Sequence, residues 1–370
     1  MLLADPPRKP KPSAATYRRR RAVAAGALVL AAFSVVGAVV SVGGGAERVA
    51  AQAAAPRPGP ITIEWVGDIT PGSAMGVPPG DGGVQFAGVR RRLRAADLTF
   101  GNLEGTYSVG GDSKCGGQTG HACFAFQAPL DHAVALRRSG FDAVNLANNH
   151  AWDYGARGQA QTLRALRRAG VAAAGRPGEI TIVRRGRLRV ALLGFAAYPW
   201  AASLTDLAGV RRLVRRAGAA ADVVVVAMHA GAEGADQTRV PVGTEVAFGE
   251  DRGDSRRFAH AAVDAGADLV VGSGPHVIRG IERYHGRVIA YSLGNFAGWN
   301  NFGLGGPLSE SGILRVKLNA GGVPLSTHWI PIRLTGPGIP EIEHSGESKK
   351  LVEQLSRADF GRAAGIMPRT

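Results

Sequence analysis

The stretch "NLANNHAWDYG", residues 145–155, places two adjacent amides, an imidazole and a carboxylate directly after an apolar, strand-like run. Asn149 could bind a metal ion through its side-chain oxygen, and His150 could then donate a proton to a leaving oxygen. Asp153 could orient that imidazole, or it could cap the helix that follows. The stretch therefore predicts a metal ligand and a proton donor at one turn.

Further acidic and imidazole side chains follow strand-like runs elsewhere in the chain. Asp68 follows "ITIEWVG", Glu104 follows "LTFGN", His229 follows "VVVVAM" and His276 follows "DLVVGSGP". Open α/β sheets bind ligands just beyond the carboxyl ends of their strands, so we expect these positions to converge with Asn149 and His150. A lone histidine at such a place is commonly a hydrogen-bonded, partly buried residue, and only the joint placement favours a site.

The predicted ligands are a mixture of oxygen and nitrogen donors. Such a set suits Mn, Fe or Zn better than Mg or Ca, and the lack of a thiolate argues against a closed structural zinc site. We expect one or two divalent ions. In a two-metal site a carboxylate bridges the cations, whose shared water attacks in line, and Glu104 is the predicted bridge.

Other short motifs add little. "SLGNF", residues 292–296, could bring Asn295 or backbone N–H groups toward a phosphate or carboxylate, or could be a tight turn. Neither a P-loop nor a dinucleotide-binding glycine motif occurs between a strand and a helix, and no "GxSxG" is present. Nucleotide cofactors and serine hydrolase chemistry therefore have little support.

The elements that must position these residues alternate between helix and strand. Arginine-studded amphipathic segments end at Gly and lead into β-branched runs, as in "LVRRAGAAADVVVVAMHAG". This alternation predicts an α/β fold. Further predicted strands are 61–66, 97–101, 188–195, 287–292, 312–318 and 326–334. The last of these follow one another without a helix, which predicts a partly antiparallel sheet system.

The N-terminus predicts membrane attachment. Residues 1–21 form a basic tail with seven Lys/Arg and one acid, and residues 22–42 contain no charge. This length matches a bilayer core, and the flanking arginines place the tail in the cytoplasm and the rest outside the cell. We expect a transmembrane signal anchor in the cell membrane, although "AAQAAA" at 50–55 would also suit signal-peptide cleavage and secretion. A linker, 43–60, precedes a domain over 61–335, and 336–370 is predicted to be a C-terminal tail with a short helix over 348–360.

The formal net charge of +15 falls to +9 beyond residue 21, where 37 basic and 28 acidic residues remain. This excess is compatible with phosphates, polyanions or lipid headgroups, and equally with arginine-rich coding and no partner. We predict no nucleic-acid partner.

Cys115 and Cys123, eight positions apart, predict a disulfide in an oxidising compartment. A metal site that includes His121 is the weaker alternative because it lacks a fourth ligand.

Taken in order, "VGDIT", "LTFGNLEG", "GFDAVNLANNHAWDYG", "MHAGAE" and "DAGADLVVGSGPHVIRGIERYHGRVIAYSLGNF" resemble the CapA-like poly-γ-glutamate capsule biosynthesis proteins of the calcineurin-like metallophosphoesterase superfamily. The resemblance covers about residues 61–300 and extends toward 335. It implies a β-sandwich flanked by helices (α/β/β/α), with a dinuclear metal site at strand ends.

The resemblance also implies roles for single residues. Asp68 matches the first metal aspartate, Glu104 the bridging acid, Asn149 and His150 the ligand and donor pair, and His229 and His276 further ligands. The sequence departs from the pattern where Ser273 and Gly274 replace a histidine, so one metal position lacks a ligand unless Ser273 or water completes it. The predicted substrate-binding residues are Asn148, Glu233, Ser273 and Asn295.

These observations predict an anchored extracytoplasmic protein of capsule or poly-γ-glutamate biosynthesis with a metal-dependent hydrolase-like site. Its expected partners are an anionic polymer or a phosphate ester, the cytoplasmic membrane and membrane synthase subunits. One alternative is a non-catalytic, polymer-binding assembly subunit, and the other is a free-standing metal-dependent phosphoesterase.

Overall fold

The computed structural model describes residues 59–73, 75–116 and 123–366. The predicted basic tail, the apolar segment 22–42 and nearly all of the linker lie outside the described residues. Among the helices that are described, none combines the length and the apolar character needed to span a bilayer.

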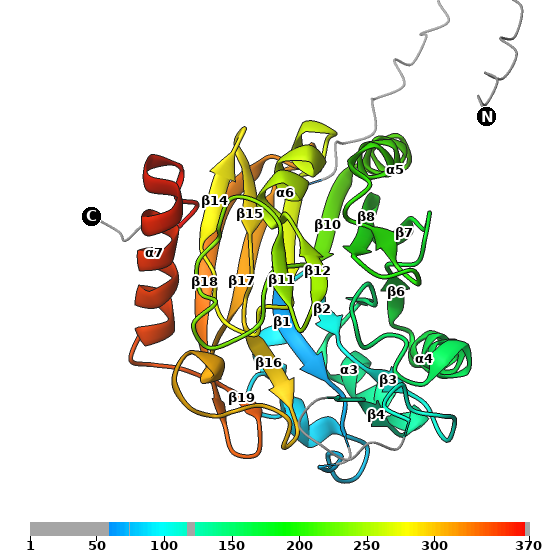
Figure 1. The fold of residues 1–370 in the computed structure, drawn as a ribbon. Helices are drawn as coiled ribbons and strands as arrows, with labels where there is room; N and C mark the ends of the chain where they lie inside the picture. Colours follow the sequence, from blue (N-terminus) through cyan, green and yellow to red (C-terminus); the bar gives the residue numbers. More distant parts are fainter. Residues whose placement is uncertain (1–58, 74, 117–122, 367–370) are drawn as a thin grey trace, which may run out of the picture. The chain divides into compact units, whose positions relative to one another are not determined.

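Two large β-sheets form the centre of the fold (Figure 1). The first contains, in spatial order, β19 (Ile339–Ile342), β18 (Pro324–Thr335), β17 (Glu310–Leu318), β1 (Ile61–Thr70), β2 (Leu98–Leu103), β5 (Ala143–Asn145) and β6 (Ala172–Ala174), with β16 (Asn295–Gly298) also paired to β1. The second contains β14 (Ile281–Tyr284), β15 (Arg287–Ala290), β13 (Leu269–Ser273), β10 (Val223–His229), β8 (Leu188–Ala196) and β7 (Thr181–Arg185), with β9 (Ala202–Ser203) beside β8. Two short pairs complete the strands: β3 (Thr106–Tyr107) with β4 (Gln127–Ala128), and β11 (Glu245–Ala247) with β12 (Glu250–Gly253).

The two sheets share one buried core. Trp65 of β1 and Phe100 of β2 pack edge to face, with ring centroids 5.9 Å apart, in the same cluster as Val225 of β10 and Val271 of β13. The side chains of a strand that is covered on both faces are all buried, which explains why "VVVVAMH" in β10 is apolar almost throughout. The predicted α/β class is confirmed.

Helices cover the outer faces of both sheets. Side chains of α3 (Ala133–Ser139) and α4 (Gly155–Ala169) pack on the outer face of the first sheet. Those of α5 (Leu207–Ala220) and α6 (Ser255–Asp264) pack on the second. Both α5 and α6 begin at an aspartate whose carboxylate accepts a backbone N–H bond, and α3 and α4 end at glycines with positive φ. The short helices are α2 (Arg90–Leu93), η1 (Gly83–Phe86), η2 (Leu130–His132), η3 (Gly306–Ser309) and η4 (Gly361–Ala363).

Parallel pairing brings the ends of the site strands to the same edges. β1, β2, β5 and β6 are parallel neighbours, and so are β8, β10, β13 and β15. Asp68 of β1 lies opposite Asn102 of β2 on one side and Asn295 of β16 on the other. The predicted site residues at the ends of these strands therefore lie close to one another.

The predicted domain end at residue 335 is wrong. β19 pairs with β18, and α7 (Glu347–Phe360) runs beside β18 and β14 (Figure 1). Trp329 Nε1 donates to Ser348 Oγ at 2.9 Å, and Val352 is fully buried. The Pro- and Gly-rich stretch before α7 is a turn and an edge strand, where a proline is tolerated. The described residues from 59 to 366 belong to one compact unit, and the helix predicted over 348–360 is confirmed.

We predict that Val352→Ala lowers the free energy of unfolding by about 2 kcal/mol, because it removes buried methyl groups and leaves a cavity. Gln354→Ala, on the exposed face of the same helix, serves as the control and is expected to change it by less than about 0.5 kcal/mol. Denaturant unfolding of the two variants measures this difference. Equal stability of both would show that α7 is not part of the folded core.

Candidate metal centre

Glu104 lies at the centre of the predicted site and is fully buried. Its Oε1 atom is 3.7 Å from His229 Nε2 and 3.7 Å from His276 Nε2. One ligand atom each from Asp68, Glu104 and His276 lie within 4.8 Å of one another. The side chains from β1, the end of β2, β10 and the loop after β13 thus meet as the sequence predicted.

Asparagine amides hold the first-sheet side of this cluster in place. Asn102 Nδ2 donates to Asp68 Oδ1 at 2.8 Å, and Asn102 Oδ1 accepts from the Nδ2 atoms of Asn145 at 2.9 Å and Asn148 at 3.1 Å. Asn148 Nδ2 also donates to Leu103 O, and its Oδ1 accepts from His150 N. Asn148 has no exposed surface through which to contact a substrate. The structure therefore places Asn148 behind the site, where it positions the loop.

Several buried polar atoms of the predicted ligands have no hydrogen-bond partner. Within the described residues these include both carboxylate oxygens of Glu104, Nε2 of His229 and Oδ1 of Asn149. Buried polar groups are nearly always paired, because an unpaired one costs roughly 1–3 kcal/mol. All three residues are predicted ligands. Carboxylate, imidazole and amide donors together fit a divalent cation such as Mn, Fe or Zn.

The shifted pKa values of the buried carboxyl and imidazole groups indicate that the cluster lacks positive charge. Burial, and then the neighbouring Asp68, raise the pKa of Glu104 to about 8. Burial alone would lower the pKa of His276, but the carboxylates of Glu104 and Asp68 raise it to about 9. Burial, and then the charge of Arg252, lower the pKa of His229 well below its ordinary value. A cation at this point would supply the charge that protons otherwise provide.

His276 is held in a strained backbone conformation. Its φ of 62° lies in the left-handed region, which a non-glycine residue adopts rarely and often at functional sites. Its Nδ1 atom is 2.9 Å from Asn295 Oδ1 and 3.2 Å from Asp68 Oδ2. Asn295 Nδ2 donates to Leu308 O, so both ends of that amide contact the protein. Asn295 therefore fixes the imidazole ring of His276.

Ser273 contacts the rear of His229. Its Oγ lies 3.2 Å from His229 Nδ1 and donates to Met228 O at 3.3 Å. The other ring nitrogen, Nε2, faces Glu104. This is the usual arrangement of a metal-binding imidazole, whose distant nitrogen is held by a neighbouring polar group. Ser273 is buried, so the structure places it behind His229 and away from solvent.

Asp153 faces His150 and does not cap α4. Its Oδ2 atom is 2.8 Å from His150 Nδ1, whereas α4 has Tyr154 at its N-cap and no side-chain capping bond. Burial lowers the pKa of His150, and the charge of Asp153 opposes this effect. Of the two readings of Asp153, the geometry supports the one in which it orients the imidazole.

Residues on either side of the disulfide loop contact His150 and Asp153. Cys115 and Cys123 are bonded, with Cα atoms 5.7 Å apart, so the predicted disulfide is confirmed and the thiol metal site is excluded. Lys114, just before the loop, places Nζ 2.7 Å from Asp153 Oδ1. Phe126, just after it, donates its N–H to Asp153 Oδ2, and its ring centroid is 4.2 Å from that of His150.

Sequence reasoning missed Lys114 and Arg252. Arg252 of β12 is buried and forms an ion pair with Glu233, whose Oε2 atom is 3.7 Å from His276 Nε2. Both residues contact predicted site residues, yet each comes from a segment with no motif of its own. The only signal for Lys114 is its position beside the disulfide, and the only signal for Arg252 is a basic residue that follows two acids in a short strand.

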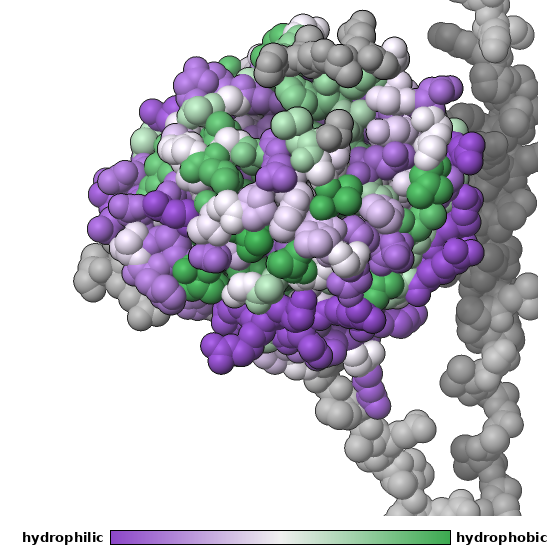
Figure 2. Space-filling view, turned by 90° about the horizontal axis from the view of Figure 1, so that it is seen from below, coloured by the Kyte–Doolittle hydropathy of each residue, from purple (hydrophilic) through white to green (hydrophobic). Residues whose placement is uncertain are grey.

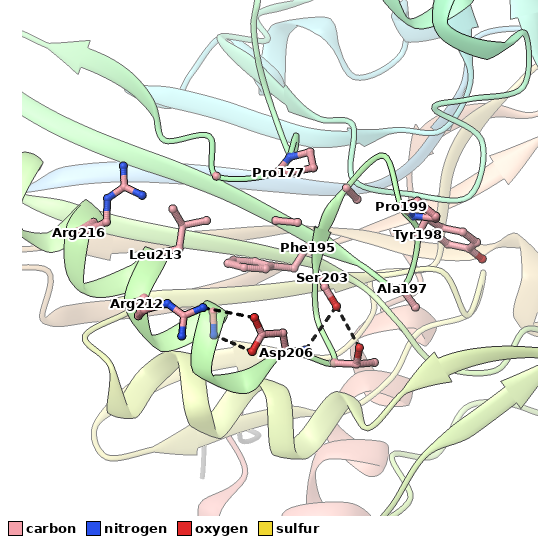
Figure 3. A pocket seen from close by; sticks show the side chains of 15 residues that line it. Pro177, Phe195, Ala197, Tyr198, Pro199, Ser203, Asp206, Arg212, Leu213 and Arg216 are labelled. Carbon is pink, nitrogen blue, oxygen red and sulfur yellow. Dashed lines mark hydrogen bonds and ion pairs between the residues drawn. The ribbon is translucent and has the colours of Figure 1, made fainter. Parts of the chain in front are cut away.

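A cavity of about 260 Å³ opens beside the cluster and is lined by His150, Glu233, His276 and Asn295, among others. Viewed from below, toward the carboxyl end of β1, the surface carries separate groups of hydrophobic residues among hydrophilic ones (Figure 2). A larger cavity of about 580 Å³ lies between α5 and the loop after β8 (Figure 3). There Arg212 pairs with Asp206 at 3.5 Å, and none of the predicted site residues lines it. We therefore treat the smaller cavity, which His150 and His276 line, as the candidate site.

Residues 62–299 match the family model described as "Bacterial capsule synthesis protein PGA_cap". The chain belongs to this family. Every predicted site residue, from Asp68 to Asn295, lies inside the matched region.

Two named relatives agree with this assignment. The chain is 30% identical to the PGA biosynthesis protein CapA of Bacillus subtilis (strain 168), over 65% of this chain and 64% of the relative. It is also 30% identical to the capsule biosynthesis protein CapA of Bacillus anthracis, over 80% of this chain and 73% of the relative. The chain thus spans slightly less than two thirds of the B. subtilis protein.

Solved structures show more distant similarity. A 5'-nucleotidase precursor from Thermus thermophilus is 15% identical, with a TM-score of 0.42 over 81% of this chain and 59% of that chain. The NAD nucleotidase of Haemophilus influenzae is 14% identical, with a TM-score of 0.42 over 80% and 62%.

We predict that Glu104→Gln does not destabilise the protein in the presence of a chelator, and that it raises the free energy of unfolding by about 1 kcal/mol or more. The substitution keeps the side-chain shape and removes a carboxyl group that, once buried, must either take up a proton or carry a charge without a partner.

Glu64→Gln is the matched control for this prediction. Glu64 is equally buried, but it pairs with Arg315 at 2.7 Å and Arg92 at 3.2 Å, so its loss should cost roughly 3–5 kcal/mol. Denaturant unfolding compares the two variants. A Glu104→Gln protein as unstable as Glu64→Gln would mean that the Glu104 carboxylate is satisfied without a cation.

Proposed function

We propose that this chain is a membrane-anchored, extracytoplasmic protein of capsule or poly-γ-glutamate biosynthesis with a metal-dependent, hydrolase-like site. The observation that carries the proposal is the buried carboxylate of Glu104, which has no hydrogen-bond partner and lies between Asp68, His229 and His276. The names of the Bacillus relatives support the biosynthetic role.

In this proposal Asp68, Glu104, Asn149, His229 and His276 hold the cation. When bound, a divalent cation stabilises negative charge on the substrate and acidifies a water molecule. Ser273 stands where the family resemblance places a histidine, and its hydroxyl is directed to Met228 O. The ligand set is therefore one imidazole short of a full dinuclear centre, which favours a single tightly held ion.

The proton donor is His150. In the imidazolium form, which the charge of Asp153 favours, Nδ1–H donates to Asp153 and the second ring proton, on Nε2, passes to the leaving oxygen. Lys114 holds the other oxygen of Asp153, so the carboxylate keeps its orientation. The ring of Phe126 lies against the imidazole and limits the access of water.

The second candidate is a non-catalytic subunit that binds polymer or supports a membrane synthase. The replacement of a histidine by Ser273 is the observation in its favour, because a site with fewer ligands can bind a carboxylate polymer without turning it over. The moderately basic chain is compatible with an anionic polymer.

The experiment compares the full-length protein with three variants, one of which is a control. Mn²⁺ is expected to raise the melting temperature of the wild type and of His150→Gln, but not of Glu104→Gln. His150→Gln should lower the Mn²⁺-dependent hydrolysis of p-nitrophenyl phosphate by about 10²–10⁴-fold, since it removes the proton donor. His260→Gln is the control and should leave both readouts unchanged, because His260 pairs with Glu282 outside the site.

The outcomes separate the candidates. Metal binding together with binding of poly-γ-glutamate, but without hydrolysis of any ester or of the polymer, would support the assembly subunit. Absence of a Mn²⁺ effect on the melting temperature of the wild type would contradict both metal-based proposals.

The proposed location rests on the apolar segment 22–42 and on the disulfide, which persists in oxidising compartments. We predict that protease added to intact protoplasts digests the folded domain, while the protein sediments with the membrane fraction. A cytoplasmic marker enzyme should remain intact in the same sample. Protection of the domain until the protoplasts are lysed would place it in the cytoplasm and overturn this part of the proposal.

A further inference from the structure

The cavity beside the metal centre is lined by side chains of two chemical kinds. The polar ones are His150, Glu233, His276, Asn295 and Asn301. The apolar ones are Phe124, Phe126, Phe248, Phe302 and Leu308, and two glycines complete the described lining. The cavity therefore suits a molecule that has both a polar and an apolar part.

The charge of the lining argues against a polyanion in this cavity. Among the residues that the structure describes, no Lys or Arg lines it. Glu233 is the one acid in this described lining, and the buried Arg252 compensates its charge. A polyglutamate segment bears a carboxylate on each residue, and burying those charges here without cations is unfavourable.

The phenylalanines at the mouth are exposed and come from separate loops. Phe248 is 82% exposed and Phe124 is 54% exposed. Phe248 lies at the turn between β11 and β12 with a φ of 53°, a left-handed conformation that is costly for a bulky residue. A fixed, exposed aromatic residue in a strained turn beside a reactive site indicates a contact surface for an apolar ligand.

Buried ion pairs keep this hairpin in place. Arg279 donates to both oxygens of Glu245 in β11, at 2.9 and 2.7 Å, and Arg252 in β12 pairs with Glu233. Arg252 and Arg279 are almost completely buried. Two buried ion pairs therefore hold the hairpin that carries Phe248, and one of them, Arg252 with Glu233, borders the metal centre.

We propose that this cavity binds the apolar alcohol part of a phosphate monoester whose phosphate lies at the metal centre. The inference rests on the proposed hydrolase-like site and adds the class of leaving group. A water oxygen forms a bond to phosphorus and loses a proton to solvent, the bond between phosphorus and the alcohol oxygen breaks, and the Nε2–H of the His150 imidazolium gives that oxygen its proton. The products are inorganic phosphate and an apolar alcohol.

The size of the cavity limits what it can enclose. At about 260 Å³ it is smaller than the roughly 300–1,000 Å³ of typical ligand pockets. It accommodates a short alkyl chain, and a longer chain must leave between the exposed rings of Phe124 and Phe248. Such a chain could belong to a soluble ester or to a lipid in a membrane, and both share the same chemistry.

The test uses the full-length, Mn²⁺-loaded protein and a series of methyl, butyl and hexyl phosphate. These leaving alcohols are chemically alike, so differences in kcat/KM report contact with the chain. Since one buried CH₂ contributes about 0.8 kcal/mol, we expect hexyl phosphate to exceed methyl phosphate by at least about tenfold. Dodecyl phosphate in phosphatidylcholine vesicles forms a second arm. Faster turnover there than of hexyl phosphate identifies a membrane source, and slower turnover identifies a soluble one.

Substitutions in the cavity test whether its phenylalanines cause the preference for hexyl phosphate. Phe124→Ser combined with Phe248→Ser should reduce the hexyl-to-methyl ratio of kcat/KM to less than about threefold. Val242→Ser is the matched control, because Val242 is 83% exposed but does not line this cavity, and it should leave the ratio unchanged. A ratio near one in the wild type, or a ratio that the double variant does not change, would overturn the inference.

A binding measurement separates this inference from the proposed function. Calorimetry should show that hexylphosphonate binds at least about tenfold more tightly than methylphosphonate, with a negative heat-capacity change in the wild type that is smaller in the double variant. If Mn²⁺ binds and all esters react equally, only the cavity inference fails. If neither Mn²⁺ binding nor turnover of any ester is seen, the proposed function itself fails.

Discussion

The unpaired carboxylate of Glu104 is the constraint on which the rest of the site depends. It is fully buried, its two oxygens accept no hydrogen bond, and the carboxylate of Asp68 lies beside it. In a low-dielectric interior this arrangement is unfavourable unless positive charge is supplied. Three features lie around this carboxylate: the histidines, the strained backbone of His276 and the positive charge of Arg252.

The fold holds this arrangement rigidly because its supports are themselves buried and paired. The amides of Asn102, Asn145 and Asn148 link the ends of β2 and β5 to Asp68, while Ser273 and Asn295 fix the two imidazoles from behind. Four of the five lie at strand ends, between sheets that share one core. A site built on such supports is organised before any ligand binds.

The sequence was sufficient to predict that the residues at the centre of the candidate site lie close together, but not which residues surround them. Asp68, Glu104, His229 and His276 follow apolar runs, and parallel strands bring their carboxyl ends together. Lys114, Arg252 and the phenylalanines of the cavity come from loops and a short hairpin, whose positions depend on tertiary contacts that no local pattern encodes. The folded C-terminus was missed for a similar reason, since an edge strand after Gly and Pro resembles a tail until its partner strand is known.

Asp68, Glu104, His229 and His276 are the residues that we propose hold a divalent cation. The most direct test is a crystal of the wild-type protein grown with Mn²⁺, with diffraction measured on both sides of the manganese absorption edge. The account predicts an anomalous peak within coordination distance of Glu104 and His229, which disappears in Glu104→Gln. A well-ordered site with no anomalous peak, and with a protein group hydrogen-bonded to both oxygens of Glu104, would contradict it.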